Sequence, residues 1–169
     1  SFDPSAVGAR SSTVNVNSND GTDPTDSVSL TGNGTQAVIS PTPATTLNIG
    51  NVHVNQTGNG NISVDNTGNA TLSIDSMVIG GGPDANQFQF ASQGCTGQTC
   101  DTNFTVPAGG PAATVTISCT PTSIGARSAT LTINGDQESG DNVVALSCTG
   151  TAPEINVTPT TLAFGNVRV

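Results

Sequence analysis

The four cysteines are the residues of this 169-residue sequence best suited to chemistry, and two roles are open to them. They can form disulfides, which suits a chain rich in Thr, Ser, Asn and Gly in an oxidising, extracellular setting. They can also bind structural zinc, but the gap of four residues between Cys95 and Cys100 and a single remote histidine fit tetrahedral zinc poorly. We therefore expect two disulfides and an extracellular or cell-surface location.

Catalytic chemistry has little support in the sequence. His53 is the only histidine, and an internal repeat places Arg168 at the corresponding point. Arginine cannot replace a catalytic or metal-binding imidazole, so we expect His53 to lie on the surface. Ser-His-Asp and metal-hydrolase sites therefore lack a base, and the acidic pair Asp136 and Glu138 lies in an expected loop with no catalytic environment. We expect no enzymatic activity.

Two acidic loops, 19–26 and 136–142, are the best candidates for a small ligand. Calcium takes oxygen ligands from flexible loops, and each loop carries three carboxylates. The spacing of the carboxylates differs between the loops, and acidic turns are commonly only solvated. Two interpretations therefore stay open, a calcium site and a solvated loop. No other cofactor is expected. The six carboxylates are Asp20, Asp23 and Asp26 in the first loop and Asp136, Glu138 and Asp141 in the second.

Six Asn-X-Ser/Thr triplets are candidate N-glycosylation sites. A sequence this rich in Asn and Thr contains many such triplets by chance, and hydroxyl-rich faces are equally open to O-linked sugar. The six asparagines are Asn33, Asn55, Asn61, Asn69, Asn103 and Asn156.

The chain repeats itself with a period of about 116 residues, which is the size of a whole domain. Segments 1–11, 30–35 and 47–54 return as 118–128, 146–151 and 162–169. The sequence therefore predicts that residues 1–35 are the C-terminal part of one domain. Residues 36–151 would form a complete domain, and residues 152–169 would begin a third. Very short connectors at both boundaries predict a stiff rod.

The repeat also predicts the disulfide pairing. Cys119 takes the place of Phe2, and Cys148 takes the place of Gly32. A bulky ring facing a glycine in one copy and two cysteines in the other is consistent with one contact made in two ways. We therefore pair Cys119 with Cys148 and Cys95 with Cys100.

Strict alternation of apolar and hydroxylated residues predicts β-strands with one buried face. It runs through 113–119, 129–133 and 144–148, and it places Cys119 and Cys148 on the apolar side. Segments 61–66 and 70–74 flank Thr67-Gly68-Asn69, which predicts a hairpin whose turn uses positive φ. Seven to nine short strands per repeat predict an all-β chain of tandem immunoglobulin-like β-sandwiches.

The charge distribution limits the partners. The net charge of −9 argues against binding to nucleic acid or to anionic membranes, and no segment approaches the roughly 18 apolar residues of a membrane span. Arg10 and Arg127 occupy the same point of each repeat. Each could pair with a carboxylate of a neighbouring domain, or form a local ion pair at the start of a strand.

Five further segments of the sequence belong together: Ile49–Val52, Val64–Ile74, Cys119–Thr122, Gly125–Leu131 and Leu146–Thr151. Together they resemble the Hydin-type (ASH) immunoglobulin-like domains and the bacterial "choice-of-anchor D" repeats. The resemblance implies tandem sandwiches in long secreted or surface proteins whose anchor lies elsewhere, and no shared catalytic residues. Cys119 stands where such domains usually have Phe, which fits the added disulfide.

These features together predict a structural segment of an extracellular bacterial filament or surface stalk, built from disulfide-stabilised tandem domains. Its partners would be neighbouring copies or repeats of itself, arranged end to end. The alternative is an adhesin, or a glycan- or calcium-binding module of a secreted surface protein, whose partners would be host or matrix glycans and proteins. The absence of Trp and Tyr removes the usual platforms for sugar stacking and makes this alternative weaker.

Overall fold

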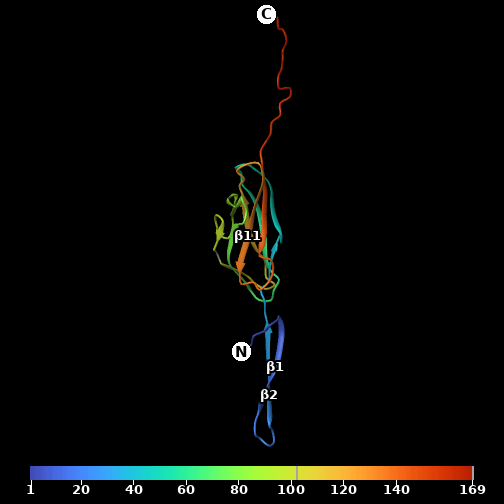
Figure 1. Cartoon of the computed structure of the whole chain (residues 1–169), viewed down its shortest axis with the longest axis vertical. Helices are drawn as coiled ribbons and strands as arrows, with labels where there is room; N and C mark the ends of the chain where they lie inside the picture. Colours follow the sequence, from blue (N-terminus) through green and yellow to red (C-terminus); the bar gives the residue numbers. More distant parts are fainter. Residues whose placement is uncertain (102, 169) are drawn as a thin grey trace.

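The computed structural model describes residues 1–101 and 103–168, and the chain is arranged as three parts along one long axis (Figure 1). A two-stranded hairpin of β1 (Gly8–Asn17) and β2 (Thr25–Gly34) lies at one end. A β-sandwich occupies the middle, and residues 152–168 extend from its far end without forming a strand. The hairpin and the extended segment therefore leave the sandwich at opposite ends.

The sandwich is all-β and immunoglobulin-like, with two sheets packed face to face. Within the described residues, every strand pair is antiparallel except β4 with β12. A single turn of 3-10 helix (η1, Ala85–Gln87) precedes β7. The first sheet has the order β3 (Ile39–Thr42), β5 (Gly58–Asn66), β10 (Ala113–Cys119) and β7 (Phe88–Phe90). The second has the order β4 (Thr46–His53), β12 (Val143–Thr151), β11 (Gly125–Gly135), β6 (Leu72–Gly80) and β8 (Thr99–Cys100), and β9 (Phe104–Val106) also pairs with β6.

The alternation of residue types explains which face of each strand is buried. In β10, Val115, Ile117 and Cys119 are fully buried, whereas the threonines and the serine between them reach the solvent. The core is made of aliphatic side chains and a few phenylalanines, because the sequence has no Trp or Tyr. Its largest fully buried members include Phe88, Ile62, Leu72, Ile74, Met77, Leu131, Ile133 and Leu146. The all-β sandwich predicted from the sequence is confirmed.

The hairpin expected over residues 61–74 is wrong. Strands β5 and β6 lie in different sheets, so the chain crosses from one sheet to the other through Thr67-Gly68-Asn69. Neither Gly68 nor Asn69 adopts a positive φ. The crossing is stabilised by Asn66, whose buried amide Nδ2 donates to the carbonyl oxygens of Ala70 (2.7 Å) and Val106 (2.9 Å). These bonds tie the end of β5 to the turn before β6 and to the end of β9 (Phe104–Val106), which pairs with β6 in the second sheet.

The β1–β2 hairpin has the same register as the pair β11–β12. Gly8 lies opposite Gly34 as Gly125 lies opposite Gly150, and Val14 lies opposite Val28. The two copies of this part of the repeat therefore fold alike. The extended segment differs from its copy, because residues 39–53 form β3 and β4 whereas 152–168 contain no strand. Strands need neighbouring strands to be stable, and no described sheet lies beside this segment.

Candidate functional site

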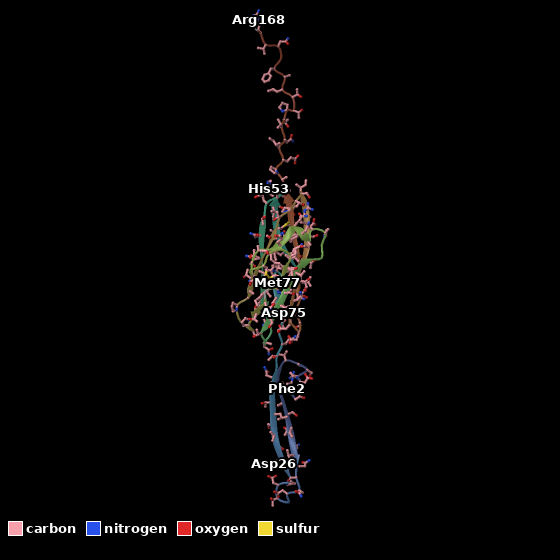
Figure 2. All side chains as sticks on the ribbon, turned by 90° about the vertical axis from the view of Figure 1, so that its left-hand side faces the viewer. Phe2, Asp26, His53, Asp75, Met77 and Arg168 are labelled. Carbon is pink, nitrogen blue, oxygen red and sulfur yellow. A yellow bond between two sulfur atoms is a disulfide. The ribbon has the colours of Figure 1, made fainter. Side chains whose placement is uncertain are left out.

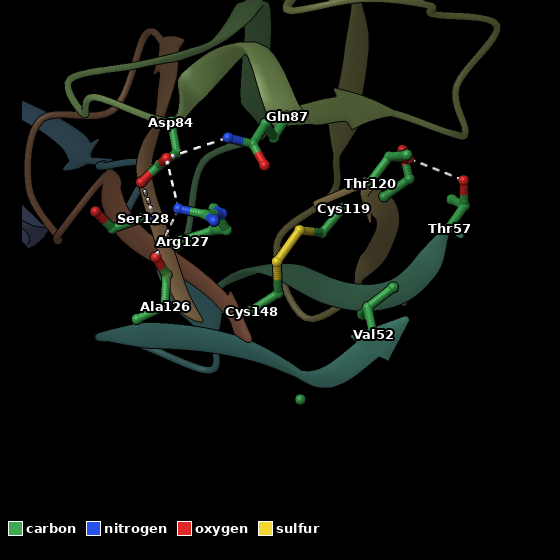
Figure 3. Close-up of a disulfide and its surroundings, with 12 residues drawn as sticks. Val52, Thr57, Asp84, Gln87, Cys119, Thr120, Ala126, Arg127, Ser128 and Cys148 are labelled. Carbon is green, nitrogen blue, oxygen red and sulfur yellow. Dashed lines mark hydrogen bonds and ion pairs between the residues drawn. A yellow bond between two sulfur atoms is a disulfide. The ribbon is translucent and has the colours of Figure 1, made fainter. Parts of the chain in front are cut away.

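The Cys119–Cys148 disulfide joins the two layers of the sandwich (Figure 3). Cys119 ends β10 in the first sheet, and Cys148 lies near the end of β12 in the second. Both side chains are buried, their Cα atoms are 6.7 Å apart, and 29 positions separate them in sequence. A covalent bond at this point prevents the two sheets from separating at the end from which residues 152–168 leave.

The hairpin makes the equivalent contact without a disulfide. The ring of Phe2 lies over Gly32, so close that a Cβ atom added to Gly32 would be only 2.5 Å from the Cζ atom of the ring. Phe2 and Gly32 correspond in the repeat to Cys119 and Cys148. The structure therefore places both pairs of equivalent residues together, once as a ring over a glycine and once as a disulfide.

The second disulfide, Cys95–Cys100, closes a short loop between β7 and β9. Its Cα atoms are 5.2 Å apart, and both side chains are buried. Backbone bonds fix this loop to both sheets, since Phe90 N–H donates to Gly97 O and Ile79 N–H donates to Gln98 O, each at 2.8 Å. The loop thus covers one edge of the sandwich, and both disulfides are the pairs expected from the sequence.

Arg127 forms an ion pair with Asp84 inside the sandwich domain, with 3.4 Å between Nη1 and Oδ1. Asp84 also accepts hydrogen bonds from Ser128 N–H (3.2 Å) and from Gln87 Nε2 (3.1 Å). Arg127 in turn donates through Nη2 to the carbonyl oxygens of Ser123 and Ile124. Figure 3 shows the bonds of Asp84 to Arg127, Ser128 and Gln87 beside the Cys119–Cys148 disulfide. The pair lies within the sandwich domain at the start of β11, as the second of the two expectations had it, although Asp84 is 43 residues away in sequence.

Arg10, the copy of Arg127, has no acidic partner among the residues that the structure describes. Its guanidinium donates to the carbonyl oxygens of Ala9 (3.2 Å) and Val7 (3.1 Å). Asp84 was not anticipated as a functional residue. Its signal in the sequence is weak, since only its position directly after Pro83 at the start of a turn distinguishes it from other surface aspartates.

The structure does not gather the candidate calcium ligands into a cluster. The described residues contain no group of three or more His, Cys, Asp or Glu side chains placed to hold a metal ion. In the first loop, Asp20 Oδ1 accepts hydrogen bonds from Thr22 N–H (2.9 Å), Thr22 Oγ1 (2.8 Å) and Asp23 N–H (3.4 Å). These bonds, led by the one from the Thr22 backbone, lower the pKa of the Asp20 carboxyl from its usual 3.8. Asp26 lies beyond them in β2.

In the second loop each carboxylate already accepts a backbone hydrogen bond. Asp136 Oδ1 accepts from Ser73 N–H (2.7 Å), and Asp141 Oδ1 accepts from Val143 N–H (3.0 Å). Glu138 Oε2 accepts from Ala37 N–H at 2.7 Å. The three groups therefore fix three different parts of the backbone, and the calcium interpretation stays a prediction.

The remaining candidates lie on the surface. His53 is exposed at the end of β4. All six candidate glycosylation asparagines are exposed as well, and Asn69 uses its Oδ1 atom to bind the backbone of Gln36. No helix among the described residues is long and apolar enough to cross a membrane.

These features define a disulfide-stabilised immunoglobulin-like domain flanked by parts that repeat its own sequence. No family model matches the chain, and no curated protein matches it. Among solved structures, the chain is similar to the ASH / PapD-like domain 7 of human CEP192, with 8% identity, a TM-score of 0.48, and coverage of 70% of this chain and 89% of that one. It is also similar to the CARDB domain of the PF1109 protein of Pyrococcus furiosus, solved with di-metal ions, with 13% identity, a TM-score of 0.42, and coverage of 70% and 88%. A family 123 glycoside hydrolase from Clostridium perfringens matches with 9% identity and a TM-score of 0.46 over 70% of this chain and 27% of its own.

Proposed function

We propose that this chain is a segment of an extracellular filament or surface stalk built from tandem immunoglobulin-like domains. One observation carries the proposal. The inner face of the β1–β2 hairpin is exposed, although the equivalent face of β11–β12 is in the core. Val14, Val16, Val28 and Leu30 are 45–54% exposed, whereas their equivalents Leu131, Ile133, Val144 and Leu146 are at most 1% exposed.

An exposed apolar face of this kind requires a partner, because soluble proteins rarely leave contiguous apolar patches in water. The partner that fits is the rest of a sandwich like the one formed by residues 36–151. It would cover the apolar face, and a residue equivalent to Asp84 would pair with Arg10. We infer that the hairpin is the last strand pair of a preceding domain.

The extended segment supports the same interpretation at the other end. Ile155, Leu162 and Val167 are 67–88% exposed, whereas their equivalents Ile39, Leu47 and Val52 are at most 7% exposed. These apolar residues are spaced as in β3 and β4, so they are suited to begin a following domain. The connections to the sandwich are only a few residues long, which favours a rod over flexibly linked domains.

The strand arrangement suits a rod under tension. The chain enters the sandwich at β3 and leaves it from β12, at opposite ends of the long axis (Figure 2). β12 is held between β4 and β11, so pulling it out along its axis would break its hydrogen bonds to both neighbours in shear. The Cys119–Cys148 bond adds a covalent link to the other sheet.

The motif segments that resemble ASH domains and "choice-of-anchor D" repeats support a secreted or surface-attached parent protein of bacterial origin. The two disulfides fit an oxidising location. The partners would be copies or repeats of the same domain, end to end, and the role would be structural, without catalysis or a cofactor.

A tandem polypeptide tests the proposal. Residues 36–117 placed directly before Ser1 would restore a complete preceding domain according to the repeat. We expect the amide protons of β1 and β2 to become protected from exchange, and the enthalpy of unfolding to about double. The matched control carries Leu30→Asp, which places a charge in the restored core and should abolish the gain. If the added residues stay unfolded and β1–β2 exchanges as before, the proposed tandem organisation is wrong.

A further inference from the structure

The linker residues 36–38, which follow Thr35 in the connection between β2 and β3, have all their backbone groups hydrogen bonded. Gln36 N–H donates to Asn69 Oδ1 (2.8 Å), and Gln36 O accepts from the N–H groups of Asn69 (2.9 Å) and Ala70 (3.1 Å). A flexible tether would leave these groups to water. Here the turn that crosses between the sheets binds both the N–H group and the carbonyl oxygen of Gln36.

The next two linker residues are held in the same way. Val38 N–H donates to Asn66 Oδ1 (3.2 Å), and Val38 O accepts from Thr67 N–H (3.0 Å). Ala37 N–H donates to Glu138 Oε2 (2.7 Å), and Ala37 O accepts from Glu138 N–H (3.2 Å). All six backbone donors and acceptors of residues 36–38 are thus satisfied by two loops of the sandwich.

The turn lies flat against the linker because Gly68 has no side chain. A Cβ atom there would collide with the carbonyl oxygen of Gln36 and would lie 2.7 Å from Val38 N. The hairpin also reaches this point, since Val7 lines a shallow hollow together with linker residues 36 and 38 and turn residues 67–69. Val7 precedes β1 and is 46% exposed, so the base of the hairpin borders this hollow beside the turn.

We propose that the turn 66–70 and the loop 136–139 form a clamp that docks the end of the preceding domain and fixes its direction. The inference rests on the proposed function in one respect, because the hairpin stands for that domain. The partner is defined by its chemistry. It has an apolar side chain at the position of Val7 and, after the two strands of the hairpin, an extended linker whose backbone groups can bind the clamp. Ile124, the copy of Val7, is 67% exposed at the other end of the sandwich and would dock on the clamp of the following copy.

The connection between this sandwich and a following domain should be slightly weaker than the one between the hairpin and the sandwich. Pro153 is the copy of Ala37 and has no N–H group, so the bond to the carboxylate equivalent to Glu138 cannot form there. The linker sequence thus changes how many hydrogen bonds hold one domain to the next.

Amide exchange measured by NMR on the whole chain tests the clamp. In Asn69→Ala we expect the Gln36 amide to exchange roughly 3- to 10-fold faster, as for the loss of one net hydrogen bond. Asn69→Asp keeps the acceptor oxygen and should retain the protection. Asn59→Ala, an exposed position at the other end of β5, is the matched control. An unchanged Gln36 exchange rate in Asn69→Ala would overturn the clamp.

Residual dipolar couplings test whether the clamp fixes direction. We expect one alignment tensor to describe both the β1–β2 hairpin and the sandwich in the unsubstituted chain. Gly68→Ala should reduce the hairpin couplings at least twofold and leave those of the sandwich unchanged. Gly80→Ala, where a Cβ atom meets nothing within 4 Å and φ is not positive, should change neither. Hairpin couplings near zero in the unsubstituted chain, or equal effects of both substitutions, would overturn the directional role.

These results are separable from the proposed function. A failure of the tandem polypeptide to protect β1–β2 would refute the filament organisation but leave the Gln36 exchange unaffected. Loss of the clamp result with a folded tandem polypeptide would instead show domains in series joined by a mobile linker.

Discussion

The residue at position 119 should decide whether glycine or alanine at position 148 gives the more stable domain. With Cys119→Ala we expect alanine to be the more stable, and with Cys119→Phe, which copies the Phe2–Gly32 contact of the hairpin, we expect glycine to be the more stable. Removing the disulfide with Cys119→Ala and Cys148→Ala should lower the free energy of unfolding by ~3–4 kcal/mol, because 29 positions separate the two cysteines. For a domain of this size the melting temperature should fall by about 10–15 °C. With Cys119→Ala retained, Cys148→Gly should be less stable than Cys148→Ala by about 0.5–1 kcal/mol, through backbone entropy in β12.

With Cys119→Phe the same change at position 148 should stabilise the domain. In the hairpin, a Cβ at Gly32 would be 2.5 Å from the Phe2 ring, about 1 Å inside ordinary contact. Overpacking of this kind costs about 1–3 kcal/mol, which exceeds the entropy cost of glycine. We therefore expect the variant that combines Cys119→Phe with Cys148→Gly to be more stable than the one that combines Cys119→Phe with Cys148→Ala. The expected difference is about 0.5–2 kcal/mol.

The assay is thermal and urea unfolding of all four combinations, read as a double-mutant cycle. Ala145→Gly, at an exposed position of the same strand, is the control and should cost the same in both backgrounds. One result would refute the reasoning. It is that glycine at position 148 lowers the stability relative to alanine by the same amount with Cys119→Ala and with Cys119→Phe. The two contacts would then not be equivalent, and the structural alignment of the repeats would fail.

Three further predictions concern the charged groups. Asp84→Ala should lower the free energy of unfolding by about 1–3 kcal/mol, since Arg127 loses its ion pair and two other donors lose their acceptor. Urea unfolding measures this change, and a value below about 0.3 kcal/mol would contradict the structural role of Asp84. The Asp20 carboxyl should titrate below 3.8 by NMR, so its contribution to the stability of the hairpin loop is present above pH 3.8 and fades as the pH falls through the lowered pKa. Thr22→Val removes the bond from the Thr22 hydroxyl and keeps the larger one from its backbone N–H, so it should raise that pKa part of the way toward 3.8. An unchanged titration would show that the hydroxyl does not contribute to the lowering. Because the acidic side chains of loop 136–142 already accept backbone bonds, we expect no heat and no change in melting temperature on adding calcium, whereas saturable binding would favour a ligand-binding module.

Much of the sandwich could be predicted from local sequence because its strands bury one face only. The alternation in β10, β11 and β12 specifies which side chains are inside, as with Val115, Ile117 and Cys119. The contact between Cys119 and Cys148 could be predicted because a second copy of the sequence has Phe2 and Gly32 at the same points.

The features that escaped prediction depend on contacts between distant residues. A Gly-Asn turn can close a hairpin or cross between sheets, and only the buried amide of Asn66, bonded to Val106, distinguishes the two. The partner of Arg127 is 43 residues away, and nothing adjacent to Asp84 indicates that it faces an arginine. The clamp likewise joins residues 36–38 to two loops that are about 30 and 100 residues further along the chain.

Electron microscopy of the native parent polypeptide would be the most direct test of an end-to-end assembly. We expect unbranched rods whose axial repeat equals the length of one sandwich with its linker, and which keep their width from end to end. Separate globular particles without an axial repeat would contradict the proposal that this chain is one section of a rod.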